Sequence, residues 1–148
     1  MTQVAFIDHV GICPTDLDAA VHFYRDGLGL EVLFDVTFDA DFEPLLGAPT
    51  AMPRTVFLGD RDRPDAGRVE LLDLGTGLLP DGATQAGVPH RGAFLLSFQV
   101  PVEETLKRLA ELGIGGTPRR IATPGGTAAV VVDPDGVMVE LVSRAVSY

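Results

Sequence analysis

A β-hairpin near the end of the chain is the feature that most constrains the fold. Residues 127–132 and 137–142 are two runs rich in β-branched side chains, each of strand length. The tetrapeptide DPDG at 133–136 joins them, and in it proline presets one turn angle while glycine accepts a positive φ. Glu140 stands in the second arm among apolar neighbours, where an unpaired carboxylate is costly to bury. The hairpin therefore predicts a sheet, and Glu140 predicts a functional position on it.

The rest of the chain repeats one pattern of elements twice. In the first half we expect a helix at 16–26, capped by Thr15, a loop at 39–53, and strands at 4–12, 30–38, 54–59 and 68–74. In the second half we expect a helix at 102–112 and strands at 93–100, 118–122, 127–132 and 137–142. Both halves therefore read as βαβββ, which indicates an internal duplication.

This repeat sets the expected domain organisation. Residues 75–92 hold five glycines and two prolines, which is typical of a linker. A four-stranded sheet with one helix has only one covered face, so each half must bury its other face elsewhere. We therefore predict an α+β fold forming one domain over 1–148, with module one at 4–74, the linker at 75–92 and module two at 93–144. The two curved sheets are expected to enclose a ligand cavity.

Charge and cysteine content exclude several classes of function. The net charge is −10, and the 11 basic residues form no patch that could displace counterions from a phosphate backbone, so no nucleic-acid partner is expected. Cys13 is the single cysteine, which excludes an intrachain disulfide and a multi-cysteine metal cluster. The first residues show no basic region typical of a signal peptide, and the apolar runs are too short to cross a bilayer. We expect a soluble cytoplasmic protein without a membrane partner.

Two segments point to a known family. DHVGICPTDLDAAVHFYRDGLGLEV at 8–32, together with DPDGVMVEL at 133–141, resembles the vicinal oxygen chelate superfamily. That group includes glyoxalase I, methylmalonyl-CoA epimerase, extradiol dioxygenases, fosfomycin-modifying enzymes and bleomycin resistance proteins. The resemblance implies a small-molecule substrate or ligand. It also implies a cavity that lies either within one chain or is shared between the two chains of a homodimer.

The resemblance also implies a metal held between the modules by residues of their first and last strands. His9, Glu70 and Glu140 occupy three of the four positions, and Leu95 stands where a histidine is expected in the fourth. Imidazole and carboxylate ligands suit a divalent Zn, Ni, Co, Mn or Fe ion, although Leu95 argues against this cofactor. Ring-cleaving dioxygenase chemistry is disfavoured because its pattern needs two histidines and one carboxylate.

Three functional hypotheses stay open at this point. The first is a metal-assisted lyase or isomerase, in which His9, Glu70 and Glu140 hold the metal and Glu140 or Glu70 moves a proton next to a carbonyl. The second is a metal-free protein that binds and sequesters a natural product or antibiotic. The third uses His9 and Glu140 as a metal-free acid–base pair.

The pattern of strand residues supplies the remaining expectations. By alternation, Leu95, Ser97 and Gln99 share one face and would line the ligand pocket. Read without the family, His9 fits a core histidine bonded to the backbone equally well. Glu70 and Glu140 would then fit a solvated strand face.

Overall fold

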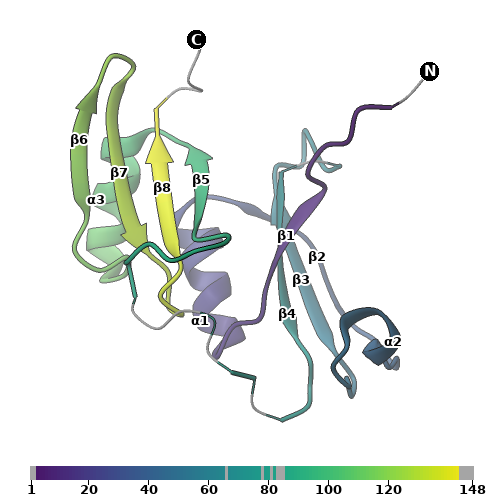
Figure 1. Cartoon of the computed structure of the whole chain (residues 1–148). Coiled ribbons are helices and arrows are strands. Elements are labelled where there is room, and N and C mark those ends of the chain that lie inside the picture. The colour runs from purple at the N-terminus through teal and green to yellow at the C-terminus, as the bar shows by residue number, and fades with distance from the viewer. Residues whose placement is uncertain (1–2, 66, 78, 81, 83–85, 144–148) are drawn as a thin grey trace. The chain divides into compact units, whose positions relative to one another are not determined.

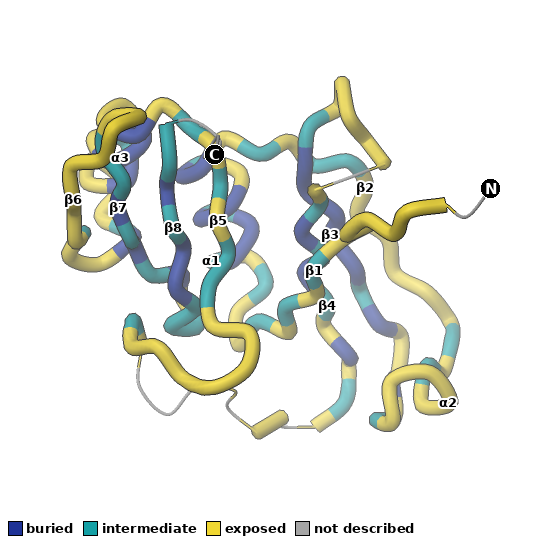
Figure 2. The backbone as a smooth tube through the Cα atoms, turned by 45° about the horizontal axis from the view of Figure 1, so that its top comes forward, coloured by how far each residue is buried: buried dark blue, intermediate teal, exposed yellow. Residues whose placement is uncertain are grey.

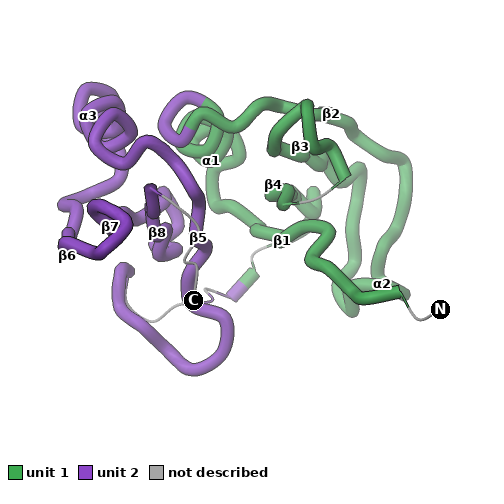
Figure 3. Tube along the Cα trace, turned by 90° about the horizontal axis from the view of Figure 1, so that it is seen from above, with its two compact units in different colours: residues 1–25, 29–79 green, residues 26–28, 80–148 purple. Residues whose placement is uncertain are grey.

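The computed structural model describes residues 3–65, 67–77, 79–80, 82 and 86–143. The predicted end of module two at residue 144, and residues 78, 81 and 83–85 of the predicted linker, lie outside this part. The chain divides into two compact units, which Figure 3 shows in different colours. Unit 1 comprises Met1–Arg25 and Gly29–Leu79, and unit 2 comprises Asp26–Leu28 and Pro80–Tyr148. That the two sheets enclose one cavity stays a prediction.

Unit 1 is built on a four-stranded sheet in the order β1-β4-β3-β2 (Figure 1). The pair β1 and β4 is parallel, whereas the other neighbours are antiparallel. Helix α1 packs against β4. The elements are β1 (His9–Ile12), α1 (Leu17–Val21) with a π-helical continuation (His22–Gly27), β2 (Glu31–Thr37), α2 (Glu43–Leu46), β3 (Arg54–Gly59) and β4 (Arg68–Asp73).

Unit 2 has the same topology, with sheet order β5-β8-β7-β6 and a parallel β5–β8 pair. Helix α3 packs against β7, and its Leu106 and Leu109 are buried, as are Val131 of β7 and Leu141 of β8. The elements are β5 (Leu95–Gln99), α3 (Val102–Leu112), β6 (Arg119–Thr123), β7 (Gly126–Val132) and β8 (Met138–Val142). The predicted α+β architecture of two βαβββ modules is therefore confirmed.

Three local predictions differ from the structure. Asp16 rather than Thr15 caps α1, because its side chain accepts a hydrogen bond from the Ala19 N–H at 3.0 Å. The first strand begins at His9 instead of residue 4, since its one sheet neighbour, β4, begins at Arg68 directly opposite His9.

The third difference is the one-turn helix α2 inside the predicted loop at 39–53. Pro44 lies in its first turn, and the Asp41 carboxylate accepts a hydrogen bond from the Glu43 N–H at 2.9 Å. Gly47, in the left-handed conformation at φ 72°, ends α2.

No helix among the described residues is both long and apolar enough to cross a membrane.

Alternation along the strands separates two faces in each sheet. The helix-covered faces carry buried apolar side chains. Figure 2 colours the buried residues of β3, β7 and β8 dark blue along the backbone. In unit 1 these include Val56, Leu58, Val69 and Leu71, each at most 3% exposed. The opposite faces carry the polar residues, so the apolar face fixes the direction in which the candidate site residues point.

The hairpin that opened the sequence argument forms with the predicted turn. Gly136 has a φ of 87° and donates its N–H to the Asp133 carbonyl at 3.1 Å. The Asp133 carboxylate is buried at 4% exposure and accepts hydrogen bonds from the N–H groups of Asp135 and Val137, at 2.9 and 2.8 Å. One side chain therefore organises the whole turn, with proline and glycine supplying its dihedral angles.

Replacing Asp133 by alanine is expected to lower the free energy of unfolding by about 1–3 kcal/mol, because two half-buried N–H groups lose their acceptor. Urea denaturation followed by circular dichroism measures the change. Asp133→Asn keeps an acceptor oxygen and is the matched control, with a smaller expected loss. Equal stability of the alanine variant and the wild type would contradict this role for Asp133.

Candidate functional site

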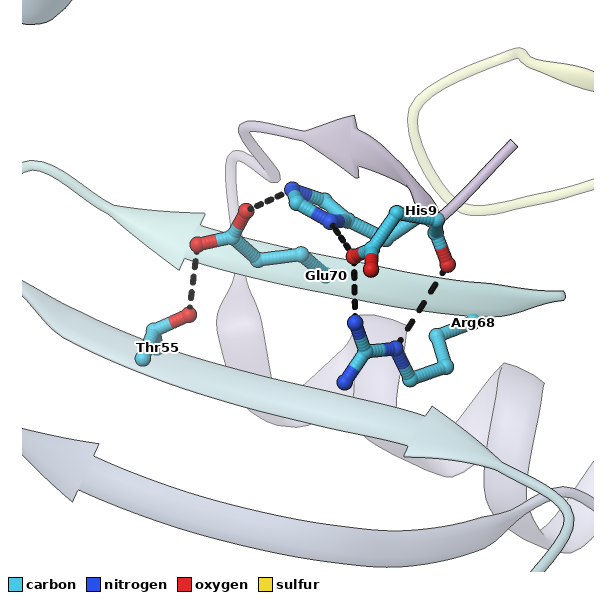
Figure 4. Close-up of polar contacts among 5 residues, drawn as sticks. His9, Thr55, Arg68 and Glu70 are labelled. Atoms are coloured by element: carbon cyan, nitrogen blue, oxygen red, sulfur yellow. Dashed lines mark hydrogen bonds and ion pairs between the residues drawn. The ribbon is translucent and has the colours of Figure 1, made fainter. Parts of the chain in front are cut away.

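In unit 1 a polar cluster lies on the sheet face opposite the helix (Figure 4). The His9 Nε2 lies 3.1 Å from a Glu70 carboxylate oxygen, and the Thr55 hydroxyl donates a hydrogen bond to the other oxygen at 2.8 Å. Strands β1, β4 and β3 supply these three side chains. The Glu70 side chain is 18% exposed and His9 is 38% exposed. His9 is therefore not a core histidine bonded to the backbone, and Glu70 is not a fully solvated carboxylate.

Asp8 and Arg68 fix the other side of the imidazole. The His9 Nδ1 lies 2.5 Å from the Asp8 carboxylate, which also accepts a hydrogen bond from the Arg68 guanidinium. The hydrogen bond from His9, and after it the one from Arg68, holds the pKa of the Asp8 carboxyl below its ordinary value. The guanidinium lies over the Phe57 ring, 5.1 Å from its centre. Asp8 thus orients the imidazole, and Arg68 orients Asp8.

This cluster surrounds one imidazole with carboxylates within hydrogen-bonding distance. Both His9 nitrogens contact carboxylate oxygens. An ionised carboxylate can accept hydrogen bonds but cannot donate one. Both contacts are therefore satisfied when a proton lies on each nitrogen. The proton on Nε2 then bridges the imidazole and Glu70, which Thr55 holds in place.

Aromatic side chains continue the same face of unit 1 beside the polar cluster. The Phe57 ring meets His9 edge to face at 5.0 Å and stacks on Phe34 at 4.6 Å. In β2, the side chains of Phe34 and Val36 alternate onto this face, and Phe38 directly follows the strand; each of the three is between 37% and 40% exposed. The polar cluster therefore adjoins an exposed apolar strip.

In unit 2 the corresponding face carries Glu140. Its carboxylate accepts a hydrogen bond from the Ser97 hydroxyl at 2.7 Å, and it lines a shallow open depression with Ile121, Ala128 and Val130. Of the predicted pocket residues, Ser97 thus lies beside Glu140, Leu95 lies two residues before it on β5, and Gln99 is exposed two residues beyond.

Strand register makes the two units directly comparable. Gly11 of β1 lies opposite Glu70, and Ser97 of β5 lies opposite Glu140. The residue two places before each of these is His9 in unit 1 and Leu95 in unit 2. Leu95 therefore occupies in unit 2 the position that His9 occupies in unit 1, in agreement with the slot inferred from sequence.

The described residues bring together His9 with Glu70, and Glu140 with Ser97. The convergence of His9, Glu70 and Glu140 on one metal stays a prediction. Within the described ranges, no group of three histidine, cysteine, aspartate or glutamate side chains is placed to hold a metal ion. Unit 1 offers one imidazole and one carboxylate in mutual contact, and unit 2 offers a single carboxylate beside a leucine. Neither of these donor sets fits a metal centre by itself.

Sequence reasoning missed Asp8, Thr55 and Arg68. Asp8 precedes His9 directly, and its proximity was available as a signal. Arg68 lies two residues before Glu70 in β4, so alternation along the strand already predicted a shared face. Thr55 is placed on that face by the β3–β4 register, in which Phe57 lies opposite Glu70. No local sequence signal supplies that register.

Each βαβββ module carries a glutamate on the open face of its last strand, Glu70 in β4 and Glu140 in β8. Two such modules in one chain define the class of small-molecule-binding proteins and enzymes to which glyoxalases belong. The chain belongs to the Glyoxalase/Bleomycin resistance protein/Dioxygenase superfamily, whose family model matches residues 6–141. It is 35% identical over 150 residues to the lactoylglutathione lyase-like protein terB of Aspergillus terreus, with 93% of this chain and 75% of that protein covered.

Solved structures share the fold. TnmS3, an antibiotic binding protein from Streptomyces sp. CB03234, has a TM-score of 0.59 and 21% identity, with 95% of this chain and 97% of that chain covered. The trypanothione-dependent glyoxalase I of Leishmania major has a TM-score of 0.63 and 23% identity, covering 94% and 86%. At these identities the similarity establishes the architecture alone, because one scaffold hosts many chemistries.

Proposed function

We propose that this protein binds a small, largely apolar organic molecule without a metal, on the sheet faces that carry Glu70 and Glu140. The observation that carries the proposal is the equivalence of Leu95 and His9. Where a histidine would complete a metal-binding set, unit 2 has Leu95, which contributes only apolar surface. Pockets for organic ligands are mostly apolar with a few oriented polar groups, and both faces have this composition.

The apolar strip of unit 1 supports the proposal. Phe34 stacks on Phe57 with one side of its ring against protein, and it is 40% exposed. An aromatic ligand that extends this stack gains both apolar burial and ring–ring contact. TnmS3 is an antibiotic binding protein, and binding of that kind is consistent with such a surface.

Titration with daunorubicin, a planar aromatic antibiotic, and with bleomycin tests the proposal by isothermal calorimetry. We expect saturable binding of the aromatic probe, with the compound recovered unchanged by mass spectrometry. Phe34→Ala is expected to weaken binding by about 3- to 10-fold, through the loss of one aromatic contact. Phe94→Ala is the matched control, since Phe94 is 39% exposed but precedes β5 in unit 2. Absence of binding of both probes would overturn the proposal.

A second function is favoured by the contact between His9 and Glu70. An imidazole and a carboxylate bridged by a proton can exchange that proton with a carbon acid next to a carbonyl, as in lyase and isomerase reactions. This pair differs from the His9–Glu140 pair considered from sequence, which stays a prediction; the contact described within unit 1 is between His9 and Glu70. The hemithioacetal of methylglyoxal and glutathione is the first substrate to test, because terB is a lactoylglutathione lyase-like protein. Turnover that Glu70→Gln abolishes would favour this function over simple binding.

A further inference from the structure

One row of residues crosses the whole sheet of unit 2 on its open face. Arg119 lies opposite Val130, Val130 lies opposite Glu140, and Glu140 lies opposite Ser97. Directly opposed residues project to the same side of a sheet, so a cation, an apolar residue and a carboxylate follow one another along the row. Neighbouring strands are about 4.8 Å apart, which separates the backbones of Arg119 and Glu140 by roughly 10 Å.

The Arg119 guanidinium is held in place without an acidic partner in the described part of the chain. Its Nη2 donates a hydrogen bond to the Gly87 carbonyl at 2.6 Å, and no carboxylate of a described residue lies within ion-pair distance. The adjacent Arg120 instead pairs with Glu103 of α3 at 2.8 Å, on the helix side of the sheet. A guanidinium has five N–H donors, so Arg119 retains donors for a bound anion.

The surface between the two charges is apolar. Arg119, Val130 and Glu140 line the same shallow depression, together with Ile121 and Ala128. Ile121 is 66% exposed, which leaves its side chain available for contact. The matching row of unit 1 reads Phe34, Phe57, Glu70 and Gly11, with no arginine, so the cationic end belongs to unit 2.

We propose that this row is the binding site of an amphipathic organic acid. The ligand's carboxylate pairs with Arg119, its apolar body lies on Val130 and Ile121, and a hydroxyl or amino group at its other end donates to Glu140. Ser97 holds the Glu140 carboxylate in position for that contact. The inference rests on the proposed small-molecule function and narrows its ligand to one carrying an anion at one end and a donor at the other.

The test uses 4-hydroxycinnamate, which carries a carboxylate and a hydroxyl at opposite ends of a flat apolar body. Binding affinity is measured by isothermal calorimetry with the full chain, so that the wild type and every variant share one readout. Arg119→Gln and the methyl ester of the probe are each expected to weaken binding by about 10-fold or more, because a charge-assisted contact is lost. Arg120 also lines the depression, so the matched control is Arg63→Gln. Arg63 is 81% exposed in unit 1, and this variant is expected to bind the probe as the wild type does.

Equal affinity of wild type and Arg119→Gln, or of acid and ester, would overturn the inference. If daunorubicin binds and 4-hydroxycinnamate does not, this inference fails while the proposed function stands. If daunorubicin, bleomycin and 4-hydroxycinnamate all fail to bind, the proposed function fails with it. Weakening by Arg119→Gln but not by Arg63→Gln supports the assignment and also excludes a general effect of reduced positive charge.

Discussion

The Leu95→His variant is expected to bind Zn²⁺ or Ni²⁺ about 10- to 100-fold more tightly than the wild type. The register of β5 and β8 places residue 95 relative to Glu140 as His9 is placed relative to Glu70, where the ring nitrogen and the carboxylate oxygen are 3.1 Å apart. The substitution therefore adds an imidazole beside a carboxylate that Ser97 already orients. Isothermal calorimetry with the metal alone measures the difference.

The double variant Leu95→His, Glu140→Gln is the control for this experiment. Its affinity is expected to return close to that of the wild type, because an amide is a much weaker ligand than a carboxylate for these ions. A wild-type chain that already binds metal as tightly as Leu95→His would contradict the conclusion that Leu95 removes a ligand. It would also restore the metal-assisted lyase or isomerase to first place among the functions.

Leu141→Ala is expected to lower the free energy of unfolding by about 2–5 kcal/mol. Leu141 follows Glu140 in β8, has no exposed surface and lies on the face covered by α3 with Val131 and Val139. Truncation to alanine removes three carbons from a closely packed layer and leaves a cavity. Denaturant unfolding followed by circular dichroism measures the loss.

Ile121→Ala serves as the comparison for that variant, because Ile121 is 66% exposed on β6 of the same unit. Its expected effect on stability is within about 0.5 kcal/mol. A loss of similar size in both variants would show that the two faces of the sheet are not divided between core and solvent as described.

Elements with strong local signals could be predicted from the sequence. Helix α3 was predicted at its observed bounds, since its leucines recur at helical spacing and Gly113 ends it in the left-handed conformation. The hairpin was predicted because its turn chemistry is specific. The predicted start of β1 was wrong because an edge strand extends only as far as the strand it pairs with. That pairing is a property of the tertiary structure. Helix α2 was missed because one capped turn carries no periodicity.

The candidate site divides in the same way. His9 and Glu70 were named from the family resemblance, which carries the positions of polar residues within strands. Their mutual contact, and the parts played by Asp8, Thr55 and Arg68, depend on the pairing of strands 15 to 60 residues apart in sequence. Such pairing cannot be predicted from a short window of sequence. The family resemblance therefore identified His9 and Glu70, but not the residues that orient them.

The alternation of faces within each sheet has a consequence for evolvability. Residues that stabilise a unit and residues that select its ligand occupy alternate positions of the same strands, as with Leu141 beside Glu140 and Leu71 beside Glu70. Substitutions on the open face therefore leave the buried layer intact. The two units already differ in this way, with His9 in one and Leu95 in the other, and with Phe34 in one and Arg119 in the other, on sheets of the same topology. New specificities on this scaffold are accessible through single substitutions, with little loss of folding stability.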